Sequence, residues 1–416
     1  MNNKYIIWCD DSRKIIGKLQ LFHSHLVETM NVSQSEILFV TLYESFSRYL
    51  VNKFNIQSIS IESIQSTFFD NHSPFYSFDL ASFDNSIQQS IILSFLSVNS
   101  YKKPPFFGQL KSCNTDDPVY GLSIYLSLWN QLINTNPTAH YFVLNGMSYP
   151  SFALSFLLAL KKMQHTFWEN GLLKSSLIFD DIGVNAYSSL QLYNSNGSIK
   201  AAKSVFNSLS HIIDSLMGSQ HDIRSILVTY QYEYDTNIKC SSPFYNKNIF
   251  SRFLYNSLSS EHQSILCKRD HPKNKRSNRL ITSLKSHLLK HKTIDSVINS
   301  SDLLITINST TGLESILSNK PTILLGSSYY SVFLRVVYIA YQSFEIPVYV
   351  FNPNIDSERR LSILECLSSV SFVCDLKLGL SEVSNFSIQD FINKSTHNNF
   401  LNSFPMTPFV SPKILH

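Results

Sequence analysis

The strongest constraint on the fold is a regular alternation of apolar, strand-like runs with helix-length segments, which becomes clear from about residue 139. Its first part is "HYFVLNG" (140–146), a helical pattern over 148–163 with Pro150 near its start, and "HTFWENG" (165–171). Two strands joined through a helix run parallel. The sequence therefore predicts a βαβ unit here.

A second alternation follows "YNSNGS" (193–198), the best linker candidate by its turn-forming residues. Two such halves predict a two-domain α/β protein with parallel sheets, helices on both faces and a cleft between the domains. The expected domains are 1–195 and 196–385, followed by a tail at 386–416. In the second half, strands are expected at 224–231, 263–269, within 296–308, at 321–326 and at 346–352, and helices at 203–217, 249–260 and 312–319.

The bulk properties agree with two domains and exclude several classes of protein. A chain of 416 residues is too long for one ordinary core, and 44% hydrophobic residues are enough to fill two. Charged residues make up 15%, below the usual ~25%. The formal net charge of +4 fits an anionic substrate or a membrane surface, but it is too small to indicate nucleic acid as a partner.

Cysteine spacing and apolar runs bear on the compartment. The six cysteines are scattered without a CxxC pair, which argues against a zinc site or a disulfide framework and favours a reducing bacterial cytoplasm. The apolar run at the N-terminus is too short for a signal peptide. The apolar segments "FLRVVYIAYQSF" and "SFALSFLLAL" contain Arg335 or stop at Lys161, so no membrane span is expected. Peripheral contact with the inner membrane stays open.

Common cofactor and metal signatures are absent. The sequence has no GxGxxG, Walker, HExxH or GxSxG motif, and its 11 glycines leave little room for glycine-rich phosphate loops. The adjacent aspartate pairs, such as Asp180-Asp181, lack the spacing of a DxD metal clamp. We therefore expect no cofactor and no metal.

A hydroxyl-rich loop follows the strand expected within 296–308. In "NSTTGLES", Ser309, Thr310 and Thr311 precede a helix that starts near Gly312. These residues are suited to capping that helix, and the same N–H groups and hydroxyls are suited to holding a phosphate. Both interpretations stay open from this loop alone.

A second cluster follows the strand expected at 263–269. "CKRDHP" places Lys268, Arg269 and His271 together, which gives three donors to an anion. The alternative is a histidine on a surface loop. Its position about one βα unit before the hydroxyl-rich loop favours the binding role.

Two carboxylates complete the set. Asp235, in "QYEYDTN", lies just beyond a predicted strand, where it could equally form an Asx turn. Glu169 ends an aromatic strand, where partial desolvation would raise its pKa as a general acid requires, although a helix cap or a salt bridge is the simpler role. All four features fall at the carboxyl ends of predicted strands, where α/β sheets bind ligands. Two carboxylates and an anion cradle suggest glycosyl transfer from a phosphate-linked sugar.

Together these segments resemble a known family. "ENGLLKSSLIFDDIGVNAYSSL", "QYEYDTN", "KRDHP" and "LLITINSTTGLESILSNKPTILLGSSYY" look like the retaining β-Kdo glycosyltransferases of bacterial capsule and O-antigen assembly, over about residues 140–330. The resemblance implies two Rossmann-like domains of the GT-B-like type, with the donor CMP-β-Kdo in the cleft. It also implies a double displacement without a metal.

The resemblance assigns roles to individual residues. Asp235 would be the nucleophile, Glu169 the acid/base toward the acceptor hydroxyl, and His271 a contact to the CMP phosphate. Glu233, on the same strand face as Asp235, is a rival nucleophile, and Asp270 intervenes between the cations and His271. The donor-binding candidates are Lys268, Arg269, Ser309, Thr310, Thr311, Gly312, Gln231 and Asn185.

Three other functions remain as alternatives. An inverting CMP-sialic acid transferase also uses a His-Pro element, but it needs one carboxylate. A non-catalytic nucleotide- or glycan-binding assembly protein needs neither, and an unrelated UDP-sugar transferase or epimerase shares the fold. The expected acceptor is a glycan or a lipid-linked saccharide, and residues 1–110 are the candidates for recognising it. Other polysaccharide-assembly enzymes are further possible partners.

Overall fold

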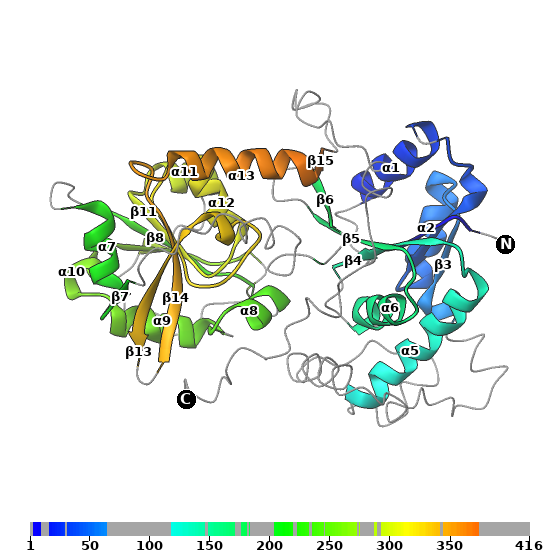
Figure 1. Ribbon diagram of the computed structural model, residues 1–416, viewed down its shortest axis with the longest axis horizontal. Helices are drawn as coiled ribbons and strands as arrows, with labels where there is room; N and C mark the ends of the chain where they lie inside the picture. Colours follow the sequence, from blue (N-terminus) through cyan, green and yellow to red (C-terminus); the bar gives the residue numbers. More distant parts are fainter. Residues whose placement is uncertain are drawn as a thin grey trace. The chain divides into compact units, whose positions relative to one another are not determined.

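The computed structural model divides the chain into two units, one around each of two β-sheets (Figure 1). The first unit contains the described residues up to 183 and again from 367 to 373, and the second contains those from 204 to 366. The structure describes residues 3–9, 16–29, 31–64, 118–145, 149–170, 176–180, 183, 204–218, 223–232, 235–244, 246–272, 274, 287–288, 293–341 and 344–373.

The sheet of the first unit has the strand order β15-β6-β5-β4-β1-β2-β3 in the described part of the chain. Neighbours from β5 to β3 are parallel, whereas β6 and β15 are antiparallel additions. The strands are β1 Tyr5–Trp8, β2 Ile37–Thr41, β3 Ser58–Ser60, β4 His140–Leu144, β5 His165–Asn170, β6 Ser176–Asp180 and β15 Ser371–Val373. The α-helices are α1 Ile16–Ser24, α2 Glu44–Phe54, α5 Pro118–Thr135 and α6 Tyr149–Leu160.

Aromatic packing fills the core of this first unit. Trp8 of β1 meets Trp129 of α5 edge to face, with ring centroids 5.2 Å apart, and Phe22 of α1 meets Phe142 of β4 at 5.0 Å. Both β1 and β2 are buried along their whole length, as strands covered on two faces must be. The expected βαβ unit of β4, α6 and β5 is confirmed, with β4 and β5 parallel.

The sheet of the second unit has the order β10-β9-β8-β11-β12-β14-β13-β7. Neighbours from β10 to β12 are parallel. The strands are β7 Val205–Phe206, β8 Ile226–Thr229, β9 Leu266–Arg269, β10 His287–Leu288, β11 Leu303–Thr306, β12 Thr322–Leu324, β13 Arg335–Tyr341 and β14 Phe344–Phe351. The α-helices are α7 Leu209–Met217, α8 Thr236–Ser241, α9 Lys247–Ser257, α10 Ser260–Ser264, α11 Ile294–Asn299, α12 Thr310–Leu317 and α13 Ser357–Val370.

Each sheet contains five adjacent parallel strands, β5 to β3 in the first and β10 to β12 in the second, and these share one winding order. Numbered along the chain within the described residues, they lie as third, second, first, fourth and fifth in both units. This is the order of a doubly wound Rossmann sheet, so the expectation of two Rossmann-like α/β domains is confirmed. The winding reverses between the first and fourth strands, which are β1 and β4 in one unit and β8 and β11 in the other. Ligands of such sheets bind at this switch point, beyond the carboxyl ends of the strands.

Helices cover both faces of the second sheet. Ile226 and Val228 of β8 pack into a core with Phe250 of α9, whereas Leu227 faces the other way, toward Val297 of α11. The alternation along β8 follows from the two-residue period of a strand. Both faces are therefore shielded from water, and the polar side chains of the candidate site lie at the strand ends.

Some expectations about individual segments are wrong. The helix expected over 203–217 begins at Leu209, because Ser208 caps it by accepting a hydrogen bond from the His211 N–H, and β7 precedes it. The strand expected at 263–269 begins at Leu266, after α10. The strand expected at 346–352 is β14, which is antiparallel to β12 and forms a hairpin with β13.

Residues 367–373 were expected in the second domain, but they lie with the first unit, because β15 pairs with β6. The expected domain boundaries after residues 195 and 385, the linker at 193–198 and the tail at 386–416 lie outside the described residues. Among the helices that are described, none has the length and apolar character needed to cross a membrane.

Candidate active site at the carboxyl edge of the second sheet

Three neighbouring strands, β9, β8 and β11, deliver the sequence-predicted side chains to one edge of the second sheet. Asp235 follows β8, His271 follows β9, and Ser309 follows β11. This edge contains the switch point between β8 and β11. The structure thus brings together the three segments of the second domain that were singled out from the sequence.

The hydroxyl-rich loop begins α12. Ser309 is its N-cap, and its Oγ accepts a hydrogen bond from the Thr311 N–H at 3.2 Å, while the Gly312 N–H donates to the Ser309 carbonyl at 2.9 Å. The buried Tyr330 hydroxyl also donates to the Ser309 carbonyl. The capping role is therefore present, and the phosphate-binding role of Ser309, Thr310 and Thr311 stays a prediction.

Gly312 allows α12 to pack closely against Tyr330 and Leu324. A Cβ at this position would lie 2.5 Å from the Tyr330 hydroxyl oxygen and 2.7 Å from Leu324 Cδ2, closer than real Cβ contacts allow. Only glycine therefore fits without a shift of α12 or its neighbours.

Asp235 caps the short helix α8. Its Oδ1 accepts a hydrogen bond from the Asn237 N–H at 2.9 Å, and its own N–H donates to the Tyr232 carbonyl at 2.9 Å. The Asx-type turn considered from the sequence is thus formed. The turn fixes the carboxylate at the strand end, and its role as nucleophile stays a prediction. The rival Glu233 lies outside the described residues.

His271 is half-buried beyond β9. Its ring centroid lies 5.8 Å from that of Tyr232, which follows β8, and its carbonyl accepts a hydrogen bond from the Asn274 N–H at 2.9 Å. Arg269, also half-buried, is the last residue of β9. Both remain candidate donors to an anion.

Lys268 is buried, with 1% of its surface exposed, and within the described part of the chain its ammonium has no hydrogen-bond partner. It pairs in register with Val228, so its side chain starts from the face that α9 covers. Burial, together with the nearby Lys247 ammonium, lowers the pKa of Lys268 to about 8, and Asp270 partly opposes this. Asp270, which interrupts the cationic run in the sequence, forms an ion pair with Lys247. Asp270 thus pairs directly with Lys247 and acts on Lys268 only through its charge.

Two amides that face each other across the switch point complete the edge. Gln231 Nε2 donates to Asn308 Oδ1 at 2.8 Å, and the Asn308 N–H donates back to Gln231 Oε1 at 3.0 Å. Sequence reasoning named Gln231 but missed Asn308. The available signal was its place as the last residue before the hydroxyls in "LLITINST".

Glu169 lies on β5 of the first unit and is half-buried. Asn145, just after β4, donates from Nδ2 to Glu169 Oε1 at 3.1 Å. Asn145 adopts a left-handed backbone conformation, with a φ of 65°, and its N–H donates to the Trp168 carbonyl. The acid/base role of Glu169 stays a prediction, and Asn185 lies outside the described residues.

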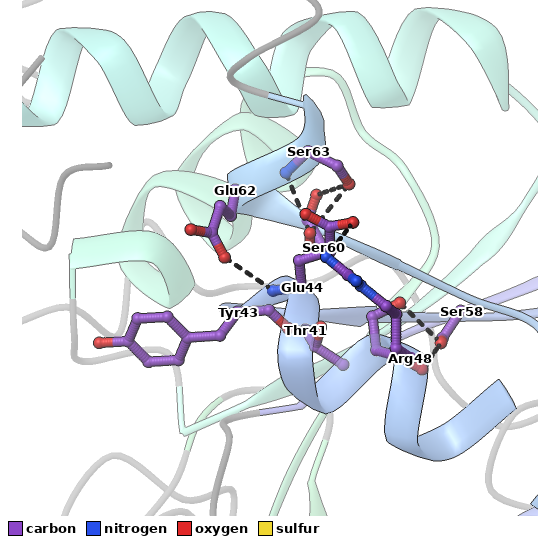
Figure 2. Close-up of polar contacts among 9 residues, drawn as sticks. Thr41, Tyr43, Glu44, Arg48, Ser58, Ser60, Glu62 and Ser63 are labelled. Atoms are coloured by element: carbon purple, nitrogen blue, oxygen red, sulfur yellow. Dashed lines mark hydrogen bonds and ion pairs between the residues drawn. The ribbon is translucent and has the colours of Figure 1, made fainter. Parts of the chain in front are cut away.

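Beyond β2 and β3 of the first unit, a carboxylate accepts a hydrogen bond from the N-terminus of α2 (Figure 2). The Glu44 N–H, at the start of α2, donates to Glu62 Oε2 at 2.9 Å. Glu44 in turn pairs with Arg48, and Ser60 accepts a hydrogen bond from the Ser63 N–H at 3.0 Å. A negative side chain here occupies the helix N-terminus, which in other proteins attracts anions. Across the described chain, no three His, Cys, Asp or Glu side chains are grouped as a metal site.

The strand order of the two sheets defines a protein with two doubly wound α/β units. Residues 190–333, which include the five adjacent parallel strands β8 to β12, match the family described as "Capsule polysaccharide biosynthesis protein".

Individual relatives are distant. Protein FixF of Sinorhizobium fredii is 25% identical over 217 residues, which cover 49% of this chain and 50% of FixF, so the chain spans about half the length of this relative. KpsC beta Kdo 2,7 transferase of Thermosulfurimonas dismutans aligns with a TM-score of 0.34 at 18% identity, over 52% of this chain and 73% of that one. UDP-GlcNAc 2-epimerase of Neisseria meningitidis aligns with a TM-score of 0.30 at 8% identity, over 96% of this chain and 97% of that one.

Proposed function

We propose that this protein is a retaining glycosyltransferase that moves Kdo from CMP-β-Kdo to a glycan or lipid-linked acceptor in capsule or O-antigen assembly. The observation that carries the proposal is the meeting of Asp235, His271 and the Ser309–Gly312 loop at the switch point of the second sheet. It is supported by the capsule family of residues 190–333 and by the sequence resemblance to β-Kdo transferases.

The second sheet would hold the anionic donor. His271, the hydroxyls and N–H groups that begin α12, and the lysines beside β9 supply positive potential to the CMP phosphate and to the Kdo carboxylate. Such fixed donors stabilise a departing phosphate without a metal ion.

Asp235 would carry the covalent step. An oxygen of its carboxylate attacks the anomeric carbon, and the bond from that carbon to the CMP phosphate breaks, releasing CMP. The acceptor hydroxyl then attacks the same carbon and breaks the bond to Asp235. Glu169 takes the hydroxyl proton, and the Asp235 carboxylate is regenerated. Two displacements return the original anomeric configuration.

The test is intact-protein mass spectrometry after incubation with freshly generated CMP-β-Kdo and no acceptor. We expect one added Kdo mass on the wild type and none on Asp235→Asn. Glu169→Gln is the matched control, because its role falls in the second displacement. It should keep the adduct and lose about 10³-fold in transfer.

Three results would contradict the proposal. Transfer without an adduct would indicate an inverting CMP-sugar transferase. Neither adduct nor CMP release would favour a non-catalytic binding protein. Calorimetric binding of UDP in preference to CMP would favour a uridine-linked sugar.

A further inference from the structure

Gln231 and Asn308 take over where the sheet ladder stops. The last registered pair of β8 and β11 is Thr229 with Thr306, and each amide lies two residues beyond its member of that pair. Past this point the two segments of the chain leave the sheet and enter different turns. The paired amides, which we call the amide hub, continue the register through side-chain bonds in place of the ladder.

The hub also connects two further strand ends. Asn308 Nδ2 donates to the Asn237 carbonyl at 3.1 Å and to the Ser327 carbonyl, beyond β12, at 3.0 Å. Asn274 Nδ2, in the turn after β9, donates to the Gln231 carbonyl at 3.0 Å. Bonds from four neighbouring strand ends therefore converge on Gln231 and Asn308, three of them through the two side-chain amides and the one from Asn274 through the Gln231 backbone carbonyl.

Two of these connections lead to a candidate catalytic or binding group. Asn237, which accepts from Asn308, donates its N–H to the Asp235 carboxylate. Asn274, which donates to Gln231, also donates its N–H to the His271 carbonyl. Asn308 itself immediately precedes the Ser309 cap of α12.

The amide hub is suited to restraining the strand ends that it connects. Asn308 is buried, with 8% of its surface exposed, and both its Nδ2 donors and its Oδ1 have partners inside the protein. A buried amide stripped of a partner destabilises its surroundings by about 1–3 kcal/mol, so the arrangement resists local slippage. Displacements of about 1 Å at a reacting group cost on the order of 10²-fold in rate.

We propose that Gln231 and Asn308 are positioning residues that hold the Asp235 turn, the His271 turn and the Ser309 loop in one fixed arrangement. The inference deepens the proposed function and rests on it for the identity of the reaction. The arrangement itself is independent of the substrate.

The experiment uses Asn308→Asp, which preserves shape and the acceptor oxygen for Gln231 but turns the Nδ2 donor into an oxygen facing two carbonyls. The matched control is Asn248→Asp, which makes the same change at an exposed position on α9. Hydrogen exchange without substrate should quicken by about tenfold or more at 235–241, around 271–274 and at 327 in Asn308→Asp only. Transfer should show kcat reduced about 10–100-fold, with KM for CMP-β-Kdo within about threefold.

Exchange that changes at residue 308 alone would overturn the hub, and so would a raised KM with unchanged kcat, since the amides would then bind the donor directly. If hydrogen exchange in Asn308→Asp quickens beyond residue 308 but the wild-type protein transfers no Kdo, the hub would be retained and only the proposed function would be refuted. If Asn308→Asp does not fold, Gln231→Glu gives the same readouts, because it keeps the acceptor for the Asn308 N–H and loses only the Nε2 donor.

Discussion

The two sheets have the same winding order, yet their carboxyl edges differ in chemical character. In the first unit, Glu62 occupies the N-terminus of α2 and Glu169 binds the amide of Asn145. In the second unit, hydroxyls begin α12, and Lys268 lies buried on β9, where its ammonium has no hydrogen-bond partner among the described residues. The fold is thus shared, and the side chains at the strand ends determine the charge that each edge accepts. An acidic edge disfavours a phosphate, which is consistent with assigning the anionic donor to the second unit.

The largest expected difference between the units is in acid stability. Burial lowers the pKa of His140 to about 3 and that of His165 to about 4, both in the first unit. Below pH 6.5 the unfolded chain therefore binds more protons, and stability that is complete above 6.5 is lost as the pH falls toward 4. Each imidazole contributes about 1.4 kcal/mol per pH unit, so the first unit should lose about 2–3 kcal/mol between pH 7 and 5.5.

Hydrogen exchange at several pH values measures this loss in each unit separately. In His165→Phe, which keeps the ring shape without a titrating nitrogen, the pH dependence should fall by about half. Equal acid loss in both units would contradict the assignment.

Substitution of Gly312 tests how tightly the α12 edge is built. Gly312→Ala should destabilise the second unit by about 2 kcal/mol, because its Cβ meets Tyr330 and Leu324, although alanine ordinarily favours a helix. The control is Gly218→Ala, where the space is open and only the φ of +68° opposes alanine, for about 1 kcal/mol. Urea unfolding compares the two, and an equal cost would show that α12 shifts freely.

Removal of the buried lysine charge should separate binding from stability at the second edge. Lys268→Met is expected to weaken CMP binding about tenfold while leaving stability unchanged or raised by about 1 kcal/mol, because a desolvated, unpaired ammonium disappears. Wild-type affinity should fall above about pH 8, where Lys268 loses its proton, and the variant should lack that decline. Calorimetry at several pH values measures the CMP affinity and its pH dependence. Lys161→Met is the control, at an exposed position in the first unit. Unchanged affinity would remove Lys268 from the donor site.

The smallest effect is expected at α2. Glu62→Gln removes the charge at this helix N-terminus and should cost the first unit about 0.5 kcal/mol in urea unfolding. The same change at the exposed Glu28 should have no measurable effect. A comparable loss in both variants would show that the position of the carboxylate is unimportant.

The sequence predicted the parts of the fold whose apolar runs are long and regular. The β4-α6-β5 unit and the β11-α12-β12 unit follow from periodicity alone, and so do the strand ends that carry the candidate site. The short strands β1 and β2 were not assigned, since runs of four or five residues among Phe- and Ser-rich loops have no distinct period. The antiparallel placement of β14 was missed, because a partner strand is a tertiary choice.

The chemistry of the site was predictable where it depends on one position and hidden where it depends on two. Asp235, His271 and Ser309 stand out because each follows a strand. The role of Asn308 depends on Gln231, 77 residues away, and the burial of Lys268 depends on α9. Neither relation is visible along the chain.

The return of the chain to the first sheet at β15 has a consequence for modular exchange. Because Ser371 pairs with Ile178, the described part of the second unit is an insertion in the first, flanked on both sides by segments of the same sheet. A fragment ending near residue 195 would lack this strand and leave β6 as an unpaired edge, open to pairing with other chains. Recombination that swaps donor modules between such proteins therefore has to replace an internal cassette, with two junctions chosen together.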